Sequence, residues 1–118
     1  MTSVTSQFER RVAASTCTVN GAVKDALREM GFEITTEQLT LIEARRGSQL
    51  AMFAMRLRRL PVAVAIRLAQ TADGCVLSGS LRDEWNRALL GPPLGLNGPY
   101  TRGFGQVQDT IDAHLARV

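Results

Sequence analysis

The chain has 118 residues, the usual size of one domain and enough to bury a core without disulfides or a structural metal. Its hydrophobic fraction of 45% is ordinary for a globular protein, and the absence of any run of about 18 apolar residues excludes a transmembrane helix. The net charge of +3 is small, but residues 44–82 hold seven arginines against one acid, Asp73. We therefore expect one soluble domain with a basic central region.

The N-terminal residues and the cysteines bear on the compartment. Residues 1–6 are expected to form a flexible tail, and residues 7–118 a single domain. The N-terminus lacks the apolar stretch of a signal peptide, and Cys17 and Cys75 have no metal-ligand spacing. We expect a cytoplasmic protein with reduced thiols, no metal and no cofactor.

A strand and a helix are expected first. Residues 7–14 favour a short strand, and a helix follows that Thr18 can cap and that Gly31, followed by Phe32, can stop. The helix is predicted from one apolar stripe at helical spacing, made of Val19, Ala22, Val23, Ala26, Leu27 and Met30.

Four strands are expected next, because apolar runs alternate with residues that break them. The breakers are Gly47–Ser48, Pro61 and Asp73–Gly74, and the last is a strong hairpin signal. Short separations favour antiparallel neighbours. The predicted strands are residues 33–45, 49–60, 62–70 and 75–82.

The remaining chain is expected to add a short helix over 83–90, a loop over 91–105 and a final helix over about 101–117. The whole predicts an α+β two-layer sandwich, with an antiparallel sheet of four to five strands and two main helices on one face. This β-α-β-β-β-β-α order is similar in outline to helix-grip and TATA-binding-protein-like folds. The apolar stripe of the final helix is Tyr100, Phe104, Val107, Ile111, Leu115 and Val118.

Strand alternation divides the sheet residues into two faces. The core set is predicted to be Ala51, Phe53, Met55, Leu57, Val62, Val64, Ile66, Leu68, Cys75, Leu77, Gly79 and Leu81. The opposite face carries small apolar residues and a row of arginines, where a sheet open to water usually carries polar residues in clean alternation. The candidate interface residues on it are Leu50, Met52, Ala54, Arg56, Arg58, Ala63, Ala65, Arg67, Ser78, Ser80 and Arg82.

Three interpretations of this face stay open. It can be an association surface, for a homodimer or a protein partner, because small residues allow close approach and arginine is enriched at interfaces. It can bind a polyanion such as nucleic acid, although it lacks the aromatic side chains on which bases stack. It can also be an ordinary face, if the register assumed here is shifted by one residue.

The loop over 91–105 is long for a compact domain and contains five of the ten glycines. It can be a lid over an apolar small molecule, or a plug packed on its own side chains. The candidate ligand-binding residues are Trp85, Leu94, Leu96, Tyr100 and Phe104.

No catalytic constellation is evident. His114 is the only histidine, and the sequence shows no catalytic or metal-ligating residue to act with it. Cys17, expected just before the first helix, has no neighbouring base. The sequence therefore favours a non-enzymatic association domain, homodimeric, partner-binding or chaperone-like. An apolar-ligand binder is the alternative and a polyanion binder the third hypothesis, and no membrane partner is expected.

Overall fold

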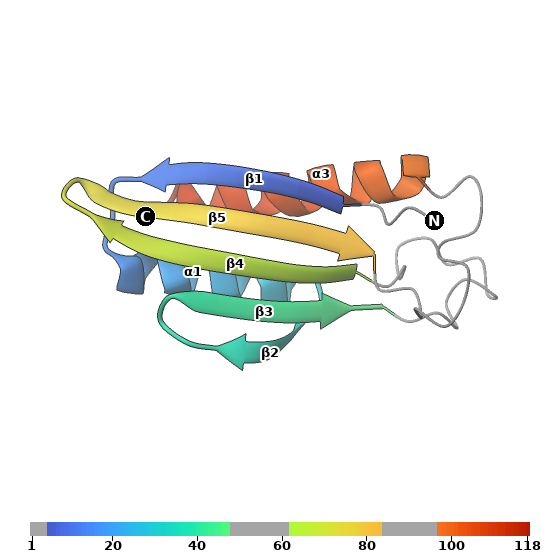
Figure 1. The fold of residues 1–118 in the computed structure, drawn as a ribbon, viewed down its shortest axis with the longest axis horizontal. Helices are drawn as coiled ribbons and strands as arrows, with labels where there is room; N and C mark the ends of the chain where they lie inside the picture. Colours follow the sequence, from blue (N-terminus) through green and yellow to red (C-terminus); the bar gives the residue numbers. More distant parts are fainter. Residues whose placement is uncertain (1–4, 48–61, 84–96) are drawn as a thin grey trace.

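The computed structural model describes residues 5–47, 62–83 and 97–118. Within these residues, one antiparallel sheet of five strands, in the order β1-β5-β4-β3-β2, carries the two described helices on a single face (Figure 1). Its elements, in chain order, are β1 (Thr5–Val12), α1 (Thr16–Glu29), β2 (Glu33–Glu37), β3 (Leu41–Arg46), β4 (Val62–Thr71), β5 (Gly74–Asp83) and α3 (Asn97–Leu115).

This arrangement is the two-layer α+β sandwich, helix-grip-like in outline, that the sequence predicts. Figure 1 shows α3 behind β1 and β5 and α1 behind β4 and β3. No helix within the described ranges is long and apolar enough to span a membrane.

The first helix begins one turn earlier than expected. Ser15 caps it, and the Ser15 hydroxyl accepts a hydrogen bond from the backbone N–H of Thr18 at 3.2 Å, so the expected cap at Thr18 is wrong. Cys17 consequently lies inside the first turn rather than before it. The end of the helix is as predicted: Gly31 has a φ of 85°, and the Phe32 N–H returns to the Leu27 carbonyl at 2.9 Å.

The expected single strand over 33–45 is in fact two strands, β2 and β3, joined at residues 38–40. That turn contains neither glycine nor proline, so it carries none of the usual local signals. The expected strand over 49–60 lies outside the described residues, and the two neighbours of β4 are β3 and β5. The described elements follow the predicted β-α-β-β-β-β-α order, but β2 and β3 both arise from the one strand expected over 33–45, and the strand expected over 49–60 stays a prediction.

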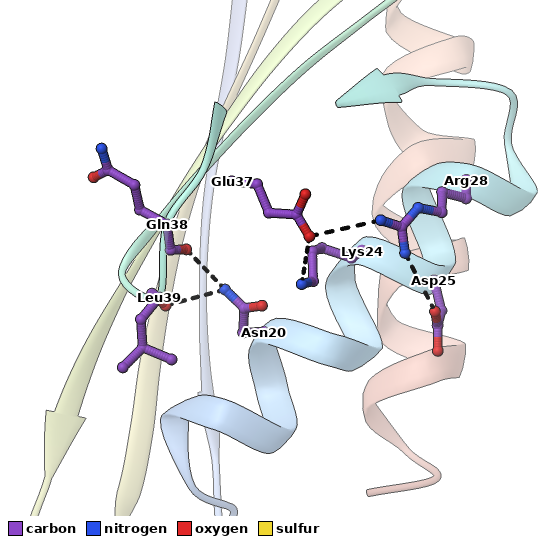
Figure 2. Close-up of polar contacts among 7 residues, drawn as sticks. All are labelled: Asn20, Lys24, Asp25, Arg28, Glu37, Gln38 and Leu39. Carbon is purple, nitrogen blue, oxygen red and sulfur yellow. Dashed lines mark hydrogen bonds and ion pairs between the residues drawn. The ribbon is translucent and has the colours of Figure 1, made fainter. Parts of the chain in front are cut away.

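Side chains of α1 hold the β2–β3 turn in place through hydrogen bonds. Asn20 is 6% exposed, and its side-chain amide donates to the carbonyls of Gln38 at 2.9 Å and Leu39 at 3.1 Å (Figure 2). One turn further along the helix, Lys24 donates to Glu37 at 2.7 Å. The turn is therefore specified by a tertiary contact.

The charges around Glu37 complete this contact between α1 and β2. A guanidinium nitrogen of Arg28 lies 3.7 Å from the Glu37 carboxylate, and its other terminal nitrogen lies 4.0 Å from Asp25 (Figure 2). The hydrogen bond and charge of Lys24 lower the pKa of Glu37 below its usual value. Both carboxylates are solvent-exposed, so these pairs stabilise the contact only modestly.

The core lies between the sheet and the helices. The predicted alternation in β4 and β5 is confirmed, because Val62, Val64, Ile66, Leu68, Cys75, Leu77, Gly79 and Leu81 are all buried. On β5, Gly79 is covered by the ring of Phe8 from β1, which a side chain at Gly79 would overlap. Arg10 of β1 then reaches Asp112 of α3, with its Nε 2.9 Å from the carboxylate.

Three predictions for the C-terminal part need correction. The helix α3 begins at Asn97, so the second half of the expected 91–105 loop is helical. Its stripe of Phe104, Val107, Ile111 and Leu115 is buried as predicted, but Val118 is 46% exposed because the helix ends before it. The expected helix over 83–90 cannot begin at Asp83, because this residue is the last of β5. The other residues of that expected helix lie outside the described ranges.

Candidate interaction surface on the outer sheet face

The face of the sheet that turns away from both helices is here called the outer face. Its members follow from the core alternation, because each strand sends successive side chains to opposite faces. The outer-face residues of the four longer strands are Thr5, Gln7, Glu9 and Arg11 of β1; Val76, Ser78, Ser80 and Arg82 of β5; Ala63, Ala65, Arg67 and Ala69 of β4; and Leu41, Glu43 and Arg45 of β3.

Strand register arranges these residues in rows that run across the sheet. The central rows are Gln7–Ser80–Ala65–Glu43 and Glu9–Ser78–Arg67–Leu41. The flanking rows are Thr5–Arg82–Ala63–Arg45 and Arg11–Val76–Ala69. Over β5 and β4, the central rows are therefore built from Ser78, Ser80 and Ala65, with Arg67 as their one long side chain.

This middle is hollowed into two shallow, connected depressions. The larger, of about 630 Å³, lies over β1, β5 and β4, and is lined by Gln7, Phe8, Glu9, Ala65, Arg67, Ser78, Gly79 and Ser80. The smaller, of about 270 Å³, extends toward β3 and β2, and is lined by Thr35, Glu43, Ala44, Arg45, Ala63, Val64, Ala65, Ser80 and Arg82. They share Ala65 and Ser80, so the hollow is continuous across the sheet.

Charges of both signs stand beside the hollow. Glu9 lies on its β1 side and Arg67 on its β4 side, and both side chains are exposed. Neither the Glu9 carboxylate nor the Arg67 guanidinium has a hydrogen bond or ion pair with any residue that the structure describes. These two groups are therefore available to a partner.

The structure brings the predicted interface residues of β4 and β5 together. Ala63, Ala65, Arg67, Ser78, Ser80 and Arg82 all lie on the outer face, although Ala63 is only 7% exposed. The other predicted members, Leu50, Met52, Ala54, Arg56 and Arg58, lie outside the described residues. That this face is an interface stays a prediction.

Sequence reasoning missed the contribution of β1 and β3. In β1, the side chains of one face alternate with those of the other: Gln7, Glu9 and Arg11 against Phe8 and Arg10. This period of two could have assigned the first three residues to the outer face. Nothing local placed Glu43 and Arg45 beside the alanines of β4, because that neighbourhood depends on the order of strands in the sheet.

The edges of the sheet are poorly suited to pairing with another strand. At one edge, β2 has five residues and an irregularity between Ile34 and Thr36. At the other edge, β1 carries Glu9, Arg10 and Arg11 in succession. Short, irregular and charged edge strands discourage edge-to-edge association. The outer face is the better candidate surface.

Of the candidate ligand-binding residues, Trp85, Leu94 and Leu96 lie outside the described residues, as does the side chain of Tyr100. Phe104 was expected both in the 91–105 loop and in the stripe of the final helix; it lies within α3, is 2% exposed and belongs to the core cluster. Its apolar surface is thus used in packing against the sheet.

The residues weighed for chemistry are dispersed. Cys17 is exposed in the first turn of α1, whereas Cys75 is buried in the core on β5. His114 lies with its Nε2 2.9 Å from a Glu29 carboxylate oxygen, a contact that joins the last turn of α3 to that of α1. Within the described ranges, no three histidine, cysteine or acidic side chains are placed to hold a metal ion.

Comparison with known proteins supports the fold. No family model and no curated protein matches the chain. Its structure is similar to that of a protein from Mesorhizobium loti, with 12% identity and a TM-score of 0.62 over 97% of this chain and 98% of that one. A protein of unknown function from Staphylococcus aureus shows 11% identity and a TM-score of 0.57, over 98% of this chain and 95% of that one. An uncharacterised protein from Rhizobium leguminosarum shows 10% identity and a TM-score of 0.55, over 99% of this chain and 97% of that one. At these identities the likeness concerns the fold alone.

Proposed function

We propose that this chain is a non-enzymatic association domain whose binding surface is the outer face of the sheet. The observation that carries this proposal is the continuous floor of small residues, Ala65, Ser78 and Ser80, in the centre of the outer face. Such a floor lets a second protein surface approach closely over these small residues, beside the longer side chain of Arg67.

The charges beside the floor support the same function. Glu9 and Arg67 border the hollow and have no partner among the described residues. Arginine suits an interface, because its planar guanidinium binds a carboxylate through two hydrogen bonds while its stem covers apolar surface. A floor of small residues with charges of both signs beside it lets a partner approach closely and pair with those charges.

The two other hypotheses have less support from the described residues. Polyanion binding is disfavoured by Glu9 and Glu43, which share the outer face with Arg67, and by the lack of an aromatic side chain among the described outer-face residues. The apolar-ligand hypothesis depends on residues outside the described ranges and on Phe104, which packs in the core.

Site-specific photo-crosslinking in living cells tests the proposal. A photoreactive phenylalanine analogue is placed at Gln7, which is exposed and lines the hollow, and in a matched control at Asp109, which is exposed on α3. We expect a protein crosslink from position 7 and none from position 109. Adding Ala65→Glu should abolish the crosslink, because it raises a charged side chain from the floor.

The mass of the product identifies the partner as a second copy or another protein. No crosslink from position 7, or a yield that Ala65→Glu leaves unchanged, would contradict the proposal. Circular dichroism of each variant confirms that the fold is retained.

A further inference from the structure

We infer that the occupant of the outer face is a second copy of this chain, packed face to face about a two-fold axis that runs parallel to β5. This inference rests on the proposed function and names its partner. It is carried by the arrangement of charge and side-chain size on the two sides of β5.

The charge pattern lies in one row. Ser78 of β5 is paired with Glu9 of β1 on one side and with Arg67 of β4 on the other. Neighbouring strands are about 4.8 Å apart, so Glu9 and Arg67 belong to backbones about 10 Å apart across the intervening strand. Each of the two side chains lacks an ion-pair partner among the described residues.

A two-fold axis in the interface plane, above Ser78 and parallel to β5, places β1 of one copy over β4 of the other. Glu9 then faces Arg67 of the partner subunit, and Arg67 faces Glu9 of the partner subunit, so one row yields two ion pairs. A two-fold axis above Ser78 that instead ran perpendicular to the strands would set Glu9 over Glu9 of the partner subunit and Arg67 over Arg67 of the partner subunit. These like-charge contacts are unfavourable. The charge pattern therefore selects the axis parallel to β5.

Side-chain size agrees with the same axis. In the two rows on either side of the Ser78 row, a long side chain of β1 and an alanine of β4 flank β5: Gln7 and Ala65 on one side, and Arg11 and Ala69 on the other. The rotation sets Gln7 and Arg11 of β1 over Ala65 and Ala69 of β4 in the other copy, so that each long side chain faces a small one. Because Arg82 also lies on β5, this axis sets it over Arg82 of the partner subunit, a like-charge contact at the end of the strand that opposes the two ion pairs.

Charge reversal tests the inference with purified protein. Sedimentation across a range of concentrations should show a dimer for the natural sequence. Glu9→Arg or Arg67→Glu alone creates two like-charge contacts, and we expect each to raise the dimer dissociation constant by about a hundredfold. The double variant Glu9→Arg/Arg67→Glu restores both pairs with exchanged signs and should return dissociation to within about tenfold of the original.

Asp109→Arg and Arg117→Glu are matched controls, since both side chains are exposed and lie outside the sheet. They should leave the dimer unchanged. A monomer at every concentration tested would overturn the inference, and so would a dimer that ignores the single reversals or is not rescued by the double variant. If the natural chain is a monomer but position 7 still crosslinks to another protein, the inference fails while the proposed function stands.

Discussion

Replacing Asn20 with aspartate isolates the tertiary contact that defines the β2–β3 turn. Asn20 is 6% exposed, and its amide nitrogen donates to the carbonyls of Gln38 at 2.9 Å and Leu39 at 3.1 Å. Asn20→Asp preserves the shape of the side chain but removes both donors. It leaves an ionised carboxylate facing two carbonyl oxygens.

The expected loss of stability follows from these contacts. A hydrogen bond contributes about 0.5–1.5 kcal/mol net, so the loss of two costs about 1–3 kcal/mol. Burying a carboxylate without a donor adds about 1–3 kcal/mol more. We expect Asn20→Asp to lower the free energy of unfolding by about 3 kcal/mol at neutral pH, and the Tm by about 10 °C for a domain of this size.

The pH dependence gives the sharper test. A buried carboxyl group beside acceptors has its folded-state pKa raised above the unfolded value of about 3.9, because the charged form is disfavoured. Its neutral form can still donate one hydrogen bond. Stability of the Asn20→Asp variant is therefore retained at low pH and lost as the pH rises through the raised pKa.

Denaturant unfolding followed by circular dichroism, on both sides of the raised pKa, measures this deficit relative to the natural chain. Gln106→Glu is the matched control, since it changes the charge equally at an exposed site on α3. The reasoning is refuted if the Asn20→Asp deficit is below about 1 kcal/mol at neutral pH, or if it does not shrink on acidification.

Two further predictions concern the core and the helix–hairpin contact. Gly79→Ala should lower the free energy of unfolding by about 1–3 kcal/mol, because the new methyl group overlaps the Phe8 ring. Denaturant titration should show the loss reduced in the Phe8→Leu background, and an equal loss there would contradict the steric explanation. Because Lys24 lowers the pKa of Glu37, the stability from this pair is present above the ordinary value of 4.5 and is lost as the pH falls through the lowered one. Glu37→Gln should therefore reduce acid sensitivity in a pH series of melting curves, and unchanged sensitivity would show that the pair contributes nothing.

The sequence by itself determined the elements whose signals are local. The stripe containing Val19, Val23 and Leu27 specified α1, and Gly31 specified its end, because helical periodicity and a left-handed residue act within a few positions. The alternation in β4 and β5 and the turn before Gly74 likewise fixed which residues of these strands face the core. Half of the candidate surface was predictable for this reason.

Only the tertiary structure decided the features that depend on distant residues. The turn at residues 38–40 has no glycine or proline, and Asn20 holds it from another element. The place of β1 beside β5 put Phe8 over Gly79, and it also put Glu9 across β5 from Arg67. Strand order is a choice among non-local pairings whose free energies depend on the packing of the whole sheet. The residue pattern within each strand therefore revealed its two faces, but it could not reveal which side chains would be neighbours on them.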